Sequence, residues 1–174
     1  MSATDGLPSA RLRQLLDHMA DATGCARVPG WADEHDRWHV YQAAVALCAL
    51  GPSLREALAS EPDEGVATSV VLLAFDRDPV REHRAWWVDA LPADRRAFVA
   101  RRADDLAVLE GVRDGSLTDV PDVTAWTHWL QRASAEQSTV PDVLEELARD
   151  GRTRKIRNIA AERLRIHHRA AARP

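Results

Sequence analysis

Apolar residues recur every three or four positions along most of the chain, which is the spacing of one buried face of an α-helix. The clearest run lies in residues 9–22, where the apolar positions are Leu12, Leu15, Leu16 and Met19. This spacing predicts a helix, and Gly24 is placed to end it in the left-handed conformation that glycine adopts without strain. β-branched residues are sparse beside Ala, Leu and Arg, so the composition also favours helix over sheet.

Glycine, proline and capping residues predict where the next helices begin and end. A helix from about residue 32 to residue 50 is expected to stop at Gly51-Pro52, with the apolar stretch 43–50 at the centre of the protein. Ser53 and Glu56 have the spacing of a capping box, in which each side chain bonds the backbone amide of the other residue. A short helix to Ser60 follows from this box.

Proline and acidic residues mark three later helix starts, since both are favoured in the first turn. One helix opens at residues 61–64, a second runs over 79–90, and a third over 92–110. The third is expected to be anchored by the apolar residues Phe98, Leu106 and Leu109. Residues 111–119 contain two glycines and are predicted to form the longest internal loop.

A short internal repeat marks the last third of the chain. Val120-Pro-Asp-Val123 recurs as Val140-Pro-Asp-Val143, and each copy is predicted to begin a helix. Short helices with one apolar face bury that face by stacking on their neighbours. We therefore expect an α-superhelical stack, with an irregular helical bundle as the alternative.

The stretch from Pro141 to Ala160 resembles one unit of the leucine-rich-repeat variant and HEAT-like families. The matching positions are Val143, Leu144, Leu147 and Ala148 in a first helix and Ile156, Arg157 and Ala160 in a second. The resemblance covers about residues 120–165 and implies a right-handed superhelix of a class that mostly binds other proteins. Some HEAT-like proteins bind nucleic acid or act as DNA glycosylases. Others carry a cysteine-bound iron–sulfur module, for which this chain lacks the four cysteines.

Length and composition suggest one globular domain over residues 1–174. Residues 1–8 and 170–174 are expected to be flexible ends, and 116–168 to form repeat-like helix pairs. Cys25 and Cys48 are isolated thiols outside any disulfide or metal-binding spacing. No leader or membrane-spanning pattern is evident, so we expect a cytoplasmic protein that needs no cofactor and does not bind a membrane.

The charge of the chain reverses near its end. Residues 149–174 hold nine of the 23 basic and two of the 27 acidic residues, a net charge of +7, against −11 for the rest. At 100° per residue, one side of a helix here is apolar and the other basic. The basic candidates for binding are Arg152, Arg154, Lys155, Arg157 and Arg165.

These arginines have three possible roles. They fit an acidic protein surface or phosphates, or they simply solvate the end of the fold and pair with the acidic body. The net charge of −4 and the pI near 6.0 argue against a nucleic acid as the main partner. The chain could also associate with itself, with the basic end of one copy on the acidic body of another.

Tryptophans occur in two pairs, Trp86-Trp87 and Trp126-x-x-Trp129. In a helical stack, one indole of each pair can pack in the core while the other lines a groove. Trp87, Trp126 and Trp129 are therefore candidate binding residues, although core packing is the more common role of tryptophan.

Two histidines provide the only metal hypothesis. His35 and His39 are four residues apart among acidic neighbours, which can place both imidazoles on one helix face. Small four-helix metal hydrolases of the DinB-like kind use three histidines, and His18 would be the third. His-x-x-x-His alone is a weak signal, and a polar helix surface explains it as well. Nucleophile elbows, phosphate loops and dinucleotide fingerprints do not occur in the sequence.

The sequence thus favours a non-catalytic adaptor or regulatory module that presents a groove and a basic helix face to an acidic protein. The alternatives are a nucleic-acid-binding protein that uses the same face and a small metal-dependent enzyme that uses His35 and His39.

Overall fold

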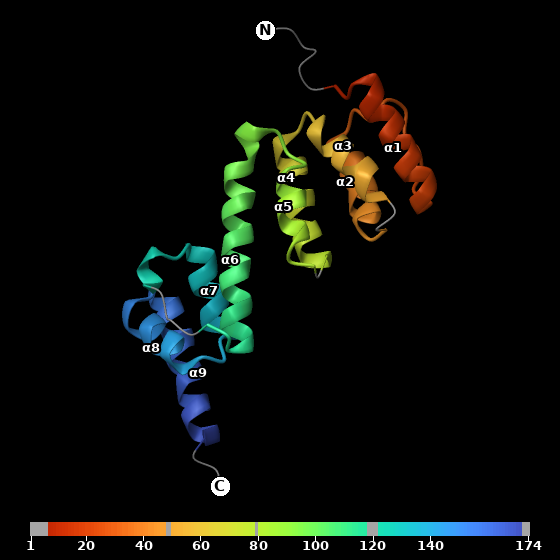
Figure 1. Ribbon diagram of the computed structural model, residues 1–174. Coiled ribbons are helices and arrows are strands. Elements are labelled where there is room, and N and C mark those ends of the chain that lie inside the picture. The colour runs from red at the N-terminus through yellow and green to blue at the C-terminus, as the bar shows by residue number, and fades with distance from the viewer. Residues whose placement is uncertain (1–6, 48–49, 79, 118–121, 172–174) are drawn as a thin grey trace. The chain divides into compact units, whose positions relative to one another are not determined.

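The computed structural model describes residues 7–47, 50–78, 80–117 and 122–171, and all regular elements in these ranges are helices (Figure 1). The α-helices are α1 Ala10–Thr23, α2 Glu34–Val45, α3 Gly51–Ala59, α4 Glu64–Arg77, α5 His83–Val88, α6 Arg96–Asp114, α7 His128–Gln137, α8 Pro141–Asp150 and α9 Arg154–Ala171. Two short 3-10 helices, η2 Ala93–Arg95 and η3 Val123–Ala125, complete the set. The predicted all-α class is confirmed.

The helices gather into two compact units, an N-terminal unit, Met1–Ala103, and a C-terminal unit, Asp104–Pro174. The boundary falls within α6. A single domain over residues 1–174 stays a prediction. Of the ends expected to be flexible, residues 1–6 and 172–174 lie outside the described ranges, whereas Pro8 is buried.

Helix α1 follows the sequence pattern closely. Its start is capped by Ser9, whose Oγ accepts a hydrogen bond from the Leu12 amide at 3.1 Å. Its end is Gly24, with a φ of 74°, as predicted. The four apolar residues of its periodic face are all buried in the N-terminal unit, where α2 and α3 pack against α1.

The predicted helix stop at Gly51-Pro52 is wrong. Helix α2 already ends at Val45, and Gly51 instead begins α3, with Pro52 in the first turn, where its missing amide costs no hydrogen bond. The expected capping box is wrong too, since α3 has no side-chain cap and Glu56 pairs with Arg11 of α1 at 2.7 Å. Leu47 is exposed, so the stretch 43–50 is not uniformly buried, and its Cys48 lies outside the described residues.

Helix α4 begins as an acidic start should, with the Asp63 carboxylate accepting from the Val66 amide at 2.9 Å. The next helix is shorter than predicted, because α5 spans only six residues. Asp78 ends α4 instead of starting α5, and its carboxylate accepts from the Val80 amide at 3.0 Å. The predicted start of this helix, Pro79, lies outside the described residues.

Helix α6 differs from its prediction at both ends. Phe98, expected to anchor it in the core, is 58% exposed and lies beneath the Arg102 guanidinium at 5.9 Å. The helix continues to Asp114, so the first part of the predicted loop is helical. Of the described residues in that loop, the non-helical ones begin at Gly115, which has a φ of 75°. Residues 118 and 119 are not described.

A buried polar cluster lies in the N-terminal unit between α2 and the start of α4. Arg37, Tyr41 and Glu61 are all removed from solvent. The Tyr41 hydroxyl donates to Glu61 Oε2 at 2.7 Å, and Arg95 donates to the Glu61 carbonyl oxygen at 3.0 Å. Every polar contact of Glu61 is thus made inside the protein, which is how a buried carboxylate is tolerated.

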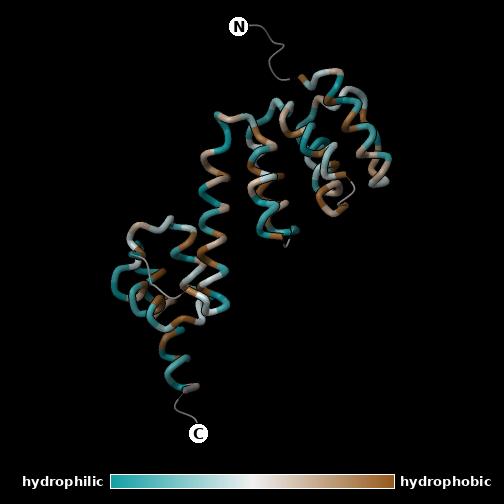
Figure 2. The backbone as a smooth tube through the Cα atoms, in the orientation of Figure 1, coloured by the Kyte–Doolittle hydropathy of each residue, from teal (hydrophilic) through white to brown (hydrophobic). Residues whose placement is uncertain are grey.

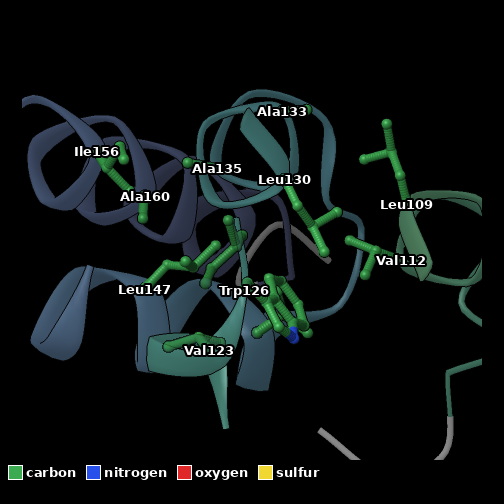
Figure 3. Close-up of a cluster of buried hydrophobic side chains, with 12 residues drawn as sticks. Leu109, Val112, Val123, Trp126, Leu130, Ala133, Ala135, Leu147, Ile156 and Ala160 are labelled. Carbon is green, nitrogen blue, oxygen red and sulfur yellow. The ribbon is translucent and has the colours of Figure 1, made fainter. Parts of the chain in front are cut away.

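The C-terminal unit is built around one apolar core (Figure 3). Buried residues of α7, α8 and α9 meet there with Leu109 and Val112 of α6 and with Trp126. Hydrophobic and hydrophilic positions alternate along the helices, as an amphipathic stack requires (Figure 2). The second copy of the repeat begins a helix, as predicted: Val140 occupies the N-cap position of α8 and Pro141 is its first residue. The first copy of the repeat leads only to the short helix η3, and its residues 120 and 121 are not described.

Candidate functional site

Four of the five basic residues predicted as a binding site, Arg152, Arg154, Lys155 and Arg157, lie around the turn between α8 and α9. Gly151 ends α8, and a side chain there would collide with the Leu147 carbonyl oxygen and come within 2.9 Å of Ile156 Cγ2. Glycine is therefore required for α9 to begin so close to α8. Arg157 donates to the Gly151 carbonyl oxygen at 2.7 Å. This predicted site residue thus closes the turn and is only partly exposed.

The turn is also fastened to α7. The Arg152 amide donates to Gln131 Oε1 at 2.8 Å, while the same glutamine donates through Nε2 to the Val123 carbonyl oxygen at 2.8 Å. Gln131 is buried. The backbone of residue 152 is consequently held in place, while its guanidinium group extends into solvent.

Three cations, Arg152, Arg154 and Lys155, form what we call the basic cluster. All three side chains are exposed, and none of them forms an ion pair or hydrogen bond with any residue that the structure describes. They adjoin the first turn of α9, which has no acidic residue and is capped by the Thr153 hydroxyl, 3.2 Å from the Ile156 amide. Because a helix N-terminus carries partial positive charge, the cluster and the helix dipole add to one positive potential.

The other arginines of this segment have partners. Arg149 pairs with Asp150 at 2.7 Å and with Glu146, and these hydrogen bonds raise the pKa of Arg149. Arg165, also predicted as a site residue, pairs with Glu162 at 2.6 Å. Of these partners only Glu146 belongs to residues 1–148, so pairing with the acidic body is seen here for Arg149 and, among the described residues, for no member of the basic cluster.

The last turns of α9 add an apolar feature that the sequence analysis missed. Ile166 is 54% exposed and, with Arg163 and His167, lines a small groove of about 160 Å³. Arg163 donates to the Ser138 carbonyl oxygen at 3.2 Å. Helical periodicity gave no signal of this exposure, because Ile166 comes seven residues after Ile159 and therefore lies at the edge of the same apolar stripe.

The three tryptophans predicted as binding residues pack in or against the cores of their units. Trp126 is buried in the core of the C-terminal unit, and Trp129 is partly buried against it. Trp87 is buried in the N-terminal unit, where its indole Nε1 donates to Asp78 at 3.2 Å and its ring meets Trp86 edge to face at 4.7 Å. Burial therefore removes Trp87 and Trp126 from the candidate binding residues.

The structure groups His35 with Asp33 and Glu34. His35 Nδ1 lies 3.2 Å from Asp33 and 3.4 Å from Glu34, close enough for the three groups to share a cation. His39 does not belong to this group. All three members are exposed, and exposed acidic groups of this kind are common without a metal. The predicted pairing of His35 with His39 as ligands is not supported.

Comparison of the chain with protein-family models, with curated proteins and with solved structures found no match. Among the described residues, none of the helices combines the length and the apolar character needed to cross a membrane. The case for a function therefore rests on the geometry of the basic cluster and its surroundings.

Proposed function

We propose that the protein is a non-catalytic interaction module that binds an acidic surface of another protein through Arg152, Arg154 and Lys155. One observation carries the proposal: these exposed cations have no partner within the described residues, although neighbouring arginines do. Three like charges at the positive end of a helix disfavour the fold slightly. An acidic partner would offset this repulsion, which gives the cluster a role in binding.

The partner surface should combine carboxylates with an apolar residue. Ile166 on the same helix offers an exposed apolar contact, and Arg169 beyond it is exposed. Charged groups at the rim of an interface raise the association rate, whereas apolar contacts at its centre supply much of the affinity. An acidic segment with one or two apolar side chains fits this arrangement best.

We further propose that α8 and α9 form a HEAT-like helix pair of a right-handed superhelix, which would present this surface on a rigid scaffold. The pairing of the two helices across the turn at residues 151–153 supports the idea. So does the burial of the repeat-like positions Val143, Leu144, Leu147, Ile156 and Ala160. Such stacks offer extended preorganised surfaces without a reactive centre.

A protein partner is favoured over a nucleic acid by the charge of the rest of the chain. Residues 1–148 carry a net charge of −11, which repels a long polyanion beyond the cluster itself. Duplex binding usually requires many phosphate contacts, and three cations supply few. A compact acidic surface needs only local complementarity.

The test uses fluorescence anisotropy with a labelled oligoglutamate peptide and the full chain. Replacing Arg152 and Arg154 by glutamate should weaken binding about tenfold, or about 1.4 kcal/mol, and added salt should weaken it further. The matched control replaces Arg77 and Arg101, two exposed arginines of the N-terminal unit, by glutamate and so changes the net charge equally. It should leave binding unchanged.

Two results would overturn the proposal. Equal loss of affinity in both double variants would mean that net charge alone attracts the peptide. Tighter binding of a labelled DNA duplex than of oligoglutamate, lost with the Arg152 and Arg154 substitutions, would assign the cluster to nucleic acid. Sedimentation of the unlabelled chain at rising concentration would show whether a second copy supplies the acidic surface.

A further inference from the structure

A cleft of about 420 Å³ lies in the N-terminal unit, between α1 and the segment that follows it. One wall is formed by Ala10, Arg13, Gln14 and Asp17, which follow one another at i, i+3, i+4 and i+7 on a single face of α1. The other wall is formed by residues 28–31. This volume lies within the range of small-molecule sites.

The α1 wall carries two opposite charges that do not pair with each other. The Arg13 side chain is exposed and forms no ion pair or hydrogen bond in the described part of the chain. The Asp17 carboxylate is partly buried, and its Oδ1 accepts from the indole Nε1 of Trp31 at 2.9 Å. One carboxylate oxygen and one guanidinium group thus remain available to a ligand.

The opposite wall is held in a strained conformation. Trp31 has a φ of 54°, a left-handed backbone that costs a non-glycine residue about 1–2 kcal/mol, and Gly30 before it has a φ of 76°. Arg37 fixes the strained segment, since its Nη1 donates to the carbonyl oxygens of Trp31 at 2.8 Å and of Ala32 at 2.9 Å. Such strain persists only where the surroundings enforce it, and it concentrates at ligand sites.

Trp31 also contains a donor without a partner. The residue is 1% exposed, and its backbone N–H forms no hydrogen bond with any described residue. Buried backbone amides are nearly always bonded, and an exception calls for a water or a ligand to explain it. Trp31 is one of the residues that line the cleft, and its indole binds Asp17 there.

We propose that this cleft binds a zwitterionic ligand of dipeptide size, with its carboxylate on Arg13 and its ammonium group on Asp17. Side chains four residues apart on a helix have Cβ atoms about 5–6 Å apart. The two charges of a dipeptide are separated by a similar span, whereas those of a single α-amino acid lie closer together. Val28 and Pro29 offer apolar contact for a side chain. The site is in the other unit from the basic cluster and is independent of the function proposed above.

The test is isothermal titration calorimetry of the full chain with a panel of dipeptides: glycyl-leucine, alanyl-alanine, glycyl-glutamate and glycyl-lysine. At least one should bind, and blocking it by N-acetylation or by C-terminal amidation should each weaken binding about tenfold or more, because each removes one charge contact. The indole N–H resonance of Trp31 should shift on binding.

Two variants separate the contacts. Arg13→Gln should lower the affinity for the free dipeptide about tenfold. It should leave the affinity for the C-terminally amidated dipeptide unchanged, since that ligand has no carboxylate to bind Arg13. Asp17→Asn keeps an oxygen that accepts from the Trp31 indole. It should lower the affinity for the free dipeptide and leave the affinity for the N-acetylated dipeptide unchanged. Arg77→Gln, at an exposed arginine of the same unit, is the control.

No binding by any member of the panel at about 10 mM, well above a Kd of 1 mM, would overturn the proposal. Equal binding of the free and both blocked forms would overturn it as well, because recognition would then not involve the two charges. A Trp31 resonance that titrates at the same ligand concentration in wild type and in both variants would overturn it too, because Arg13 and Asp17 would then not hold the ligand.

Discussion

Arg37 and Glu61 form an ion pair from which water is excluded: Nη2 and Oε1 lie 2.9 Å apart, and the two side chains are 3% and 0% exposed. Removing two charges from water is costly, and the pair is tolerated because both groups also form hydrogen bonds inside the protein. Glu61 also accepts from Tyr41 and from the Asp63 amide, whereas Arg37 also holds the backbone of Trp31. The pair therefore connects the start of α4 to the wall of the cleft.

Glu61→Gln should destabilise the protein by about 3–5 kcal/mol, because it leaves the Arg37 guanidinium buried without a counter-charge. Urea unfolding followed by circular dichroism measures the change. The control is Glu56→Gln, which breaks the exposed pair with Arg11 and should cost less than about 1 kcal/mol. Similar losses in the two variants would show that the buried pair is no more important than a surface one.

The single tyrosine of the chain gives a pH prediction. Burial, and after it the negative charge of Glu61, raises the pKa of the Tyr41 hydroxyl above its ordinary value of 10.0. Above about pH 10 the unfolded chain loses this proton while the folded chain keeps it. The free energy of unfolding should therefore be unaffected by this group below pH 10 and should fall above it, by at most about 1.4 kcal/mol per pH unit.

Tyrosinate absorbance measured against circular dichroism tests this prediction, since only Tyr41 contributes to the tyrosinate signal. Tyrosinate should appear together with unfolding. Its appearance near pH 10 in a chain that keeps its helical signal would contradict the structure. In the Tyr41→Phe variant, the part of the decrease in unfolding free energy above pH 10 that Tyr41 causes should be absent.

Gly151→Ala should destabilise the C-terminal unit by about 1–3 kcal/mol, the usual cost of forcing extra volume into a packed site. The added carbon meets a backbone oxygen, which cannot rotate away as a side chain can. Thermal unfolding checks the value. Gly65→Ala in α4 is the comparison, because the added carbon there meets only the Asp63 carboxylate, at 3.1 Å, and helix propensity favours alanine. A loss at Gly65 as large as that at Gly151 would refute the steric argument.

How far the fold followed from the sequence depended on whether the deciding contacts were local. Helix α1 was predictable because Ser9, its apolar face and Gly24 all act within one helix. The Gly51-Pro52 signal marks a helix start as readily as a helix end. Its meaning depends on tertiary packing, since a Cβ at Gly51 would lie 3.1 Å from the ring of Trp86. No local pattern reports that contact.

In the candidate site, too, local features were predictable and features that depend on tertiary contacts were not. Helical periodicity correctly placed Arg154 and Arg165 on the outer side of α9 and Ile156 on the inner side. It did not reveal that Arg157 and Arg163 bind backbone carbonyl oxygens, because those partners lie in other segments of the chain. The cleft beside α1 was missed for this reason too, since the strain of Trp31 depends on Arg37 and its buried partner.

Arg154→Glu should stabilise the protein by about 0.3–1 kcal/mol while weakening the binding of an acidic partner. The substitution replaces a cation of the first turn of α9 by an anion, which the positive end of the helix favours, and this cation has no partner in the described part of the chain. Urea unfolding gives the stability and oligoglutamate anisotropy the binding. Arg165→Glu is the matched control in the same helix: it places two like charges three residues apart in place of the pair with Glu162 and should lower stability by a few tenths of a kcal/mol. Loss of stability on Arg154→Glu would mean that the arginine has a structural partner in solution and would count against the basic cluster as a binding site.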